Sequence, residues 1–180
     1  MITTLGTERL VLRPFREDDL DALAVLHGEE SFWWFPLRRG MTAAETADFL
    51  GWVLSVNPDP VRPVFHAVVE RDSGALIGWA GLSVPEFLPE LLPAVEVGWR
   101  LGSASRGKGY ATEAATAALS WGFDTLHLEE IVSIHEPDNV PSGRVMDHLG
   151  FGPASATRDP VRDIPLLVRR LTAEEWRARA

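Results

Sequence analysis

The sequence of 180 residues contains no cysteine. This absence excludes disulfides, thiolate nucleophiles and zinc sites built on sulfur. The sequence also lacks any apolar run of about 18 residues, so it predicts no membrane-spanning helix and no membrane partner. Its first residues lack the basic segment and the apolar stretch of a secretion signal. We therefore expect a cytoplasmic protein.

Positive charge is scarce as well. The net charge is −9, and Lys108 is the single lysine of the chain. A protein that binds nucleic acid needs a basic face to neutralise phosphates, so we expect no nucleic-acid partner. An acidic protein is compatible with a cationic substrate such as an amine.

The spacing of apolar residues predicts a single α+β domain over residues 1–180. The expected element order is β-α-α-β-β-β-α-β-α-β-β, with a central sheet that is mixed and mostly antiparallel. The strand–helix–strand unit at the centre predicts one parallel pair. We expect strands at 9–15, 64–70, 75–84, 94–101, 128–136, 151–156 and 163–171, and helices at 16–28, 42–55, 109–126 and 138–150.

The stretch LGSASRGKGYAT, residues 101–112, comes within one residue of a nucleotide-binding P-loop. Gly109 stands where that motif needs a hydroxyl for Mg²⁺, so the sequence disfavours a P-loop hydrolase and predicts no metal. Gly107 and Gly109 still let backbone amides converge at the start of a helix. Arg106 and Lys108 add positive charge, and the combination is typical of an anion site. An ordinary glycine-containing loop before a helix is the alternative.

Two motifs and both ends of the chain resemble one family. The run RGKGYA, which begins at Arg106, resembles the R/Q-x-x-G-x-G/A motif of the GNAT N-acetyltransferases. The run NVPSGRVMDHLGF, which begins at Asn139, is similar to the second motif of that family, N-x-x-S-x-R-V-x-x-x-L-G-F. The segments TERLVLRPFREDDLDAL and PLLVRRLTAEEW resemble the ribosomal-protein (RimJ/RimL-type) branch. The resemblance covers nearly the whole chain and implies the GNAT fold.

The resemblance implies acetyl-CoA as the co-substrate, with loop amides on its pyrophosphate and no metal. It also implies that backbone N–H groups near Trp99 stabilise the carbonyl oxygen, that Asn139 holds the pantetheine arm and that Ser142 lies near the thiol. Many family members carry a tyrosine that acts as a general acid in the last helix, but this chain has Met146 at that position. Helix capping is the alternative role of Asn139 and Ser142. The residues expected to bind acetyl-CoA are Trp99, Arg100, Leu101, Arg106, Gly107, Lys108, Gly109, Tyr110, Ala111, Asn139 and Ser142.

Attack on a thioester needs a neutral amine, and amines with a pKa of about 8 to about 10.4 are mostly protonated at neutral pH. A general base offsets this cost. Glu96 is the leading candidate, because a carboxylate is out of place in the apolar strand AVEVGWR, unless it is exposed or paired with an arginine. We expect Glu96 to share one sheet face with Gly98 and Arg100, and Gly98 suits a bulge. His135 and, more weakly, His66 are the other candidates.

Four consecutive aromatic residues, at positions 32–35, lie between the first two expected helices. They cannot all face one core, so we expect two in the core and two at the acceptor. The substrate-binding candidates are Trp33, Trp34 and Glu96.

The sequence thus predicts an enzyme, an acetyl-CoA-dependent N-acetyltransferase with Glu96 and Ser142 as catalytic candidates. Its amine acceptor, a small molecule or a protein N-terminus, would attack directly. A catalytically idle acyl-CoA-binding sensor is the alternative. Arg38 and Arg39 either bind an acidic acceptor group or are solvated, and the apolar connection at 85–93 is a candidate homodimer contact.

Overall fold

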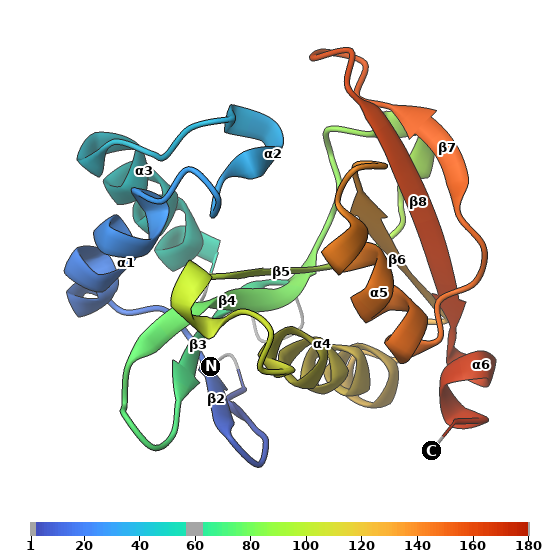
Figure 1. Cartoon of the computed structure of the whole chain (residues 1–180). Helices are drawn as coiled ribbons and strands as arrows, with labels where there is room; N and C mark the ends of the chain where they lie inside the picture. Colours follow the sequence, from blue (N-terminus) through green and yellow to red (C-terminus); the bar gives the residue numbers. More distant parts are fainter. Residues whose placement is uncertain (1–2, 57–62, 180) are drawn as a thin grey trace.

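The computed structural model describes residues 3–56 and 63–179, in which one sheet of eight strands carries helices on both faces (Figure 1). The strand order is β1-β2-β3-β4-β5-β6-β8-β7, and every neighbouring pair except β5–β6 is antiparallel. The predicted mixed, mostly antiparallel sheet is confirmed. The strands are β1 (Leu5–Gly6), β2 (Leu10–Arg13), β3 (Phe65–Glu70), β4 (Leu76–Ser83), β5 (Glu96–Leu101), β6 (Glu130–His135), β7 (Ser155–Arg158) and β8 (Pro165–Thr172).

The helices keep the predicted order, with two short additions. They are α1 (Leu20–His27), α2 (Trp34–Leu37), α3 (Ala43–Val56), α4 (Tyr110–Ser120), α5 (Val140–Leu149) and α6 (Ala173–Arg177). β1, α2 and α6 were not expected from the sequence, because elements this short give no repeating apolar pattern. A capping box of Thr172 and Glu175 starts α6. Among the described helices, none is long and apolar enough to cross a bilayer.

The parallel pair of β5 and β6 is short. Its register holds one pair, Glu96 with Val132, and the strands then part (Figure 1). The bulge expected at Gly98 is wrong, since Gly98 stays in regular register opposite Gly81 of β4. The register shift in this region lies in β3 instead. The opening therefore comes from loss of pairing with β6, and it leaves a gap in the middle of the sheet.

Small residues let α4 pack closely on one face of the sheet. Ala114, Ala115 and Ala118 are fully buried there. Gly122, in the turn after α4, lies so close to the sheet that a Cβ would stand 2.7 Å from Ile131 Cδ1. Larger side chains on this face of α4 would hold the helix away from the sheet. The other face carries α1 and α3 over an aromatic core (Figure 1).

Candidate functional site

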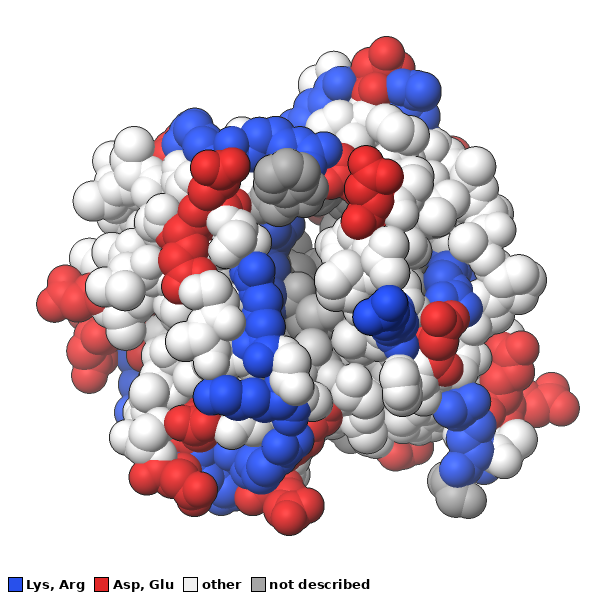
Figure 2. All heavy atoms as spheres, in the orientation of Figure 1, with Lys and Arg blue, Asp and Glu red and all other residues white. Residues whose placement is uncertain are grey.

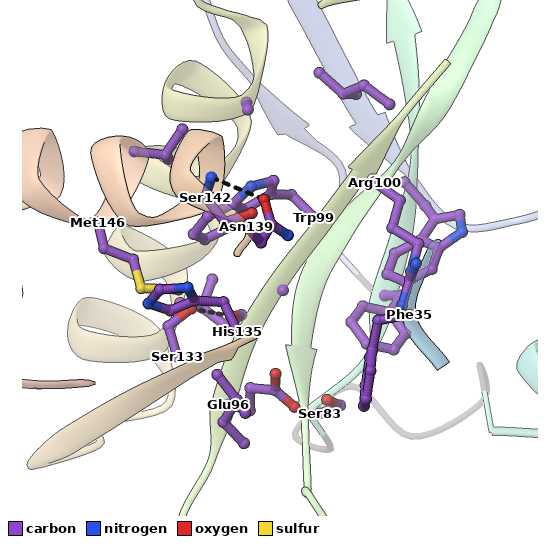
Figure 3. A pocket seen from close by; sticks show the side chains of 18 of the residues that line it. Phe35, Ser83, Glu96, Trp99, Arg100, Ser133, His135, Asn139, Ser142 and Met146 are labelled. Carbon is purple, nitrogen blue, oxygen red and sulfur yellow. Dashed lines mark hydrogen bonds between the residues drawn. The ribbon is translucent and has the colours of Figure 1, made fainter. Parts of the chain in front are cut away.

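A cavity of about 1080 Å³ opens where β5 and β6 part (Figure 3). Its walls come from the loop before α4, from β4, β5, β6 and α5, and from α2 and α3 on the other face of the sheet. Figure 2 shows a hollow between the two halves of the molecule, with a column of basic side chains along one rim. A cavity that reaches both faces of a sheet can receive two substrates from different sides.

The loop between β5 and α4 forms one end of the cavity. Gly107 and Gly109 have φ of 72° and 81°, in the left-handed region that favours glycine. Gly109 directly precedes α4, and residues 109–112 line the cavity. The free amides and the positive dipole end of α4 therefore lie at the cavity wall, as an anion site requires.

Basic side chains hold this loop in place. Arg106 donates from Nε to the carbonyl oxygen of Leu101 (3.1 Å) and from Nη2 to that of Ser31 (2.8 Å). Arg9 donates from Nη1 to the carbonyl oxygen of Lys108 (2.9 Å), and the Lys108 side chain is exposed. This contact of Arg9 with the loop could not be predicted from the sequence, because only the folded sheet brings the start of β2 beside the loop.

Tyr110, the single tyrosine, anchors the first turn of α4. Its hydroxyl donates to Glu70 Oε1 (2.6 Å), and the Arg9 guanidinium lies 4.6 Å from the centroid of its ring. The bond to Glu70 raises the pKa of the Tyr110 hydroxyl. Tyr110 is 8% exposed, so its ring supports the loop from below while its proton is held by Glu70.

Backbone groups of β5 face the gap. The carbonyl oxygens of Val95 and Val97 accept hydrogen bonds from Val132 N (2.9 Å) and Ser133 Oγ (3.0 Å), so both point toward β6. In a strand, the backbone groups of every second residue point the same way. Those of Trp99 therefore point into the gap, where its N–H can donate to a group bound between the strands.

Glu96 lies where β5 and β6 part, and its side chain lines the cavity (Figure 3). Its cross-strand neighbour on β4 is Ser83. Protein surrounds the carboxyl, and this burial raises the pKa of Glu96 to about 8, although the charge of Arg100 and the Ser83 hydroxyl lower it in part. Such a carboxyl exchanges its proton near neutral pH, as a general base must. The fully exposed arrangement left open by the sequence does not occur.

The Arg100 side chain is held by contacts within the protein. Its Nη1 donates to the carbonyl oxygen of Phe32 (2.8 Å), and its guanidinium lies 4.5 Å from the ring centroid of Trp33 and 5.5 Å from that of Trp79. Burial lowers the pKa of Arg100 to about 10. Because its side chain is occupied, Arg100 could bind acetyl-CoA, as expected from the sequence, only through its backbone groups.

The start of α5 forms the opposite wall. Asn139 is the N-cap, and its Oδ1 accepts from Ser142 N at 3.2 Å (Figure 3). Both residues line the cavity, so they cap the helix and face the gap at once. Met146, one turn further on, is 1% exposed. The alternatives of capping and contact with acetyl-CoA are therefore compatible.

His135, the second candidate base, is 9% exposed and lies beside Met146 (Figure 3). Its Nδ1 lies 2.8 Å from the carbonyl oxygen of Glu136, which only accepts, so Nδ1 carries the hydrogen and Nε2 presents a lone pair. Burial lowers the pKa of His135. His66 is fully buried, with Nε2 3.1 Å from the carbonyl oxygen of Thr3, and the described cavity wall does not include it.

Among the described side chains of the aromatic run, two lie in the core and Phe35 lines the cavity. Phe32 and Trp33 are buried in the aromatic core, 2% and 7% exposed. Trp33 was expected to bind the acceptor; instead it carries the Arg100 guanidinium and is absent from the described cavity wall. The run is bent into turns, so consecutive side chains point in different directions. The side chain of Trp34 lies outside the part that the structure describes.

Phe35 takes the place expected for Trp33. It lines the cavity, and its ring centroid lies 6.3 Å from that of Phe87, which precedes β5. No sequence pattern predicts this pair, because the two rings come from segments about fifty residues apart.

Arg38 and Arg39 are both exposed, which agrees with one of the two expected arrangements, and each also forms an ion pair. Arg38 forms an ion pair with Glu136, which is 6% exposed and lines the cavity just after β6. Arg39 forms an ion pair with Glu45 of α3, which also forms a capping box with Thr42. The Arg38–Glu136 pair therefore links the α2 segment to the β6 side of the cavity.

Known proteins resemble this chain over most of its length. Residues 9–152 match the family described as "Acetyltransferase (GNAT) domain". The uncharacterized N-acetyltransferase p20 of Bacillus licheniformis is 27% identical over 157 residues, which cover 87% of this chain and 86% of the relative. The ribosomal protein uS5-alanine N-acetyltransferase of Escherichia coli is 26% identical over 163 residues, which cover 86% of this chain and 81% of the relative.

Solved structures share the fold. The acetyltransferase (GNAT family) of Bacillus anthracis has a TM-score of 0.80 at 22% identity, covering 96% of this chain and 100% of that chain. The ribosomal-protein-S5-alanine acetyltransferase of Vibrio fischeri has a TM-score of 0.75 at 18% identity, covering 97% and 98%. The fold implied by the two sequence motifs is confirmed.

Proposed function

The chain belongs to the GNAT acetyltransferase family, and we propose that it transfers the acetyl group of acetyl-CoA to an amine by direct attack. The observation that carries the proposal is Glu96, a carboxyl with a pKa raised to about 8 at the point where β5 and β6 part. Its partner is the Trp99 N–H, which faces the same gap. A candidate base and a hydrogen-bond donor at one gap are the two groups that acetyl transfer from a thioester needs.

The loop before α4 fits the pyrophosphate of acetyl-CoA. Gly109 supports this fit, because a Cβ there would lie 3.3 Å from Arg9 Nη2 and would fill the cradle under the amides. The basic column at the rim of the hollow adds favourable charge in a protein of net charge −9 (Figure 2). Acetyl-CoA, when bound there, supplies an activated acetyl group, and Asn139 and Ser142 would meet its pantetheine arm and sulfur.

Glu96 would take the proton of the incoming ammonium ion. An α-amine has a pKa of about 8, close to that of Glu96, so moving the proton between them costs little. For an alkyl amine with a pKa of about 10.4, the difference of about 2.4 units corresponds to about 3 kcal/mol. The Trp99 N–H would donate to the acetyl oxygen as that oxygen gains charge. Ser142 would hydrogen-bond the departing sulfur, in a position where no tyrosine is present.

Two acceptor classes fall within this proposal. The relative from Escherichia coli is named for an alanine of ribosomal protein uS5, so a protein N-terminus is one class. A small-molecule amine is the other. The idle acyl-CoA sensor has no support from the relatives, whose names describe N-acetyltransferases.

The test is amine-dependent release of the CoA thiol. We would mix the protein with acetyl-CoA, a thiol reagent, and a panel of small amines and short peptides. Thiol release that depends on an amine, together with an acetylated product by mass spectrometry, is the expected result. If no amine of the panel accelerates thiol release although acetyl-CoA binds, the sensor is the better account.

A further inference from the structure

The acceptor side of the cavity is apolar where it surrounds Glu96. Gly98, two residues after Glu96 on the same strand, lies against the Phe65 ring, since a Cβ at Gly98 would stand in van der Waals contact, 3.5 Å from Phe65 Cε1. The remaining apolar lining comes from two helices and from the connection before β5. These lining residues are Phe35, Trp52, Val56, Val84 and Phe87.

The charges on this side are mainly negative. Glu96 lies deep in the wall, and Glu86 is exposed beside Phe87. Arg100 is the basic residue of this part of the described wall, and its guanidinium is already held by the Phe32 carbonyl oxygen and two indole rings. An ammonium group therefore finds carboxylates here. Arg106 and Arg144 belong to the cavity walls formed by the loop before α4 and by α5, so on this side the described lining offers a carboxylate no cation besides Arg100.

From these features we propose that the acceptor is a primary amine on an apolar, ring-sized body that carries no carboxylate. The inference rests on the proposed acetyl transfer and names the substrate class of that site. The amine lies at Glu96, and the apolar body lies between Phe35 and Phe87, whose ring centroids are 6.3 Å apart. A ring inserted there displaces or parts these two side chains and gains their apolar surface.

Charge decides between close analogues. Phenethylamine and phenylalanine share a ring and an amine, but phenylalanine adds a carboxylate next to the amine. A carboxylate beside Glu96 would be desolvated without a partner and, above about pH 8, where Glu96 is charged, repelled by a like charge. We expect kcat/KM for phenethylamine to exceed that for phenylalanine by about 100-fold or more.

The same experiment compares acceptors that present the amine on different bodies. A peptide with an N-terminal phenylalanine presents the same ring and amine, with an amide in place of the carboxylate. Ethanolamine presents the amine without the ring. We expect phenethylamine to lead, the peptide to follow if the chain beyond its first residue fits past the Arg38–Glu136 pair, and ethanolamine to be weakest.

The variant that tests the ring subsite is Phe87→Ala. Loss of one ring wall should raise the KM for phenethylamine about tenfold while the KM for acetyl-CoA stays unchanged. Phe87→Leu should restore much of the affinity. Val25→Ala is the control, since Val25 is 74% exposed on α1, outside the cavity wall, and should leave both constants unchanged. Melting temperatures of all variants check that the fold is intact.

Calorimetric titration of the free protein with phenethylamine separates this inference from the proposed transfer. Binding without any acetylation would sink the transfer reaction but keep the apolar amine subsite. Efficient acetylation of ethanolamine or phenylalanine, with phenethylamine no better, would keep the transfer reaction and overturn the subsite. An unchanged KM for phenethylamine in Phe87→Ala would overturn it as well.

Discussion

Glu96 owes its properties to its place in the sheet. It is the last residue of β5 paired with β6, so its backbone is held while its carboxyl stands at the opening. Ser83 and Arg100 stabilise the charged form only in part, and burial dominates. The same residue on the surface would titrate near its ordinary value, so the parting of two strands creates the proposed base.

A stability measurement reports on this carboxyl without any substrate. The pKa of Glu96 in the folded protein, about 8, lies above its ordinary value of 4.5. Its protonated form therefore stabilises the folded state fully below about pH 4.5, and this contribution is lost as the pH rises through about 8.

We predict that urea unfolding shows a larger loss of stability between pH 5 and pH 9 in the wild type than in Glu96→Gln. Equal losses would mean that the carboxyl titrates near its ordinary value in the folded protein. Glu86→Gln, at an exposed carboxyl of the same cavity mouth, is the matched control and should behave as the wild type.

At the scale of elements, the loop and helix that would hold the pyrophosphate act as one unit. Gly109 ends the loop in a left-handed conformation and begins α4. Any other residue there is strained by about 1–3 kcal/mol and places a Cβ near the Arg9 guanidinium. The element is therefore sensitive to substitution at this position.

Gly109→Asp should raise the Kd for acetyl-CoA about tenfold or more, through a distorted cradle and a repelled phosphate. Gly74→Asp is the matched control, because Gly74 also has a positive φ, of 68°, but lies in the turn between β3 and β4 with no atom within 4 Å of a Cβ. Titration calorimetry measures both. A Kd that stays at the wild-type value in Gly109→Asp would show that another surface holds the pyrophosphate.

Sequence patterns predicted the long helices and strands well, but they predicted less well which side chains line the cavity and which residues contact each other. The RGKGYA run correctly placed a loop before α4, because positive φ values and a helix start leave local marks. Trp33 was expected at the cavity and Phe35 was not, although Phe35 is the ring that lines it, since turns in the aromatic run decide which ring faces the cavity. Glu136 and Arg9 were missed because their partners are distant in sequence.

The whole molecule consists of two halves that meet at a short seam. Strands β1–β5 with α1–α4 form one half, and β6–β8 with α5 and α6 form the other (Figure 1). The single register pair of β5 and β6 and the Arg38–Glu136 ion pair join the halves around the cavity, and one hydrophobic core that includes Leu119, Met146 and Leu171 spans both halves. A ligand in the cavity touches both halves and should stabilise the fold as a whole. One domain over residues 1–180, and a homodimer through residues 85–93, stay predictions.

Acetyl-CoA at 100 times its Kd should stabilise the protein by about 2.7 kcal/mol. For a chain of this size, that corresponds to a rise of about 5–10 °C in Tm, since about 1 kcal/mol shifts Tm by about 2–4 °C. CoA should also raise Tm, and Mg-ATP should not. If Mg-ATP alone raised the Tm, the RGKGYA loop would be a nucleotide-binding loop and not an acetyl-CoA site.

The central claim, that Glu96 takes the proton of the attacking amine, is tested most directly by the pH dependence of kcat/KM for phenethylamine. In the wild type, kcat/KM should rise about tenfold per pH unit and level off near pH 8, where Glu96 becomes charged. Glu96→Gln should be about 100-fold slower at pH 8 and should keep rising without a bend, because only the neutral fraction of the amine then matters. Glu86→Gln should follow the wild type. A Glu96→Gln profile with the wild-type rate and the bend at pH 8 would contradict the account.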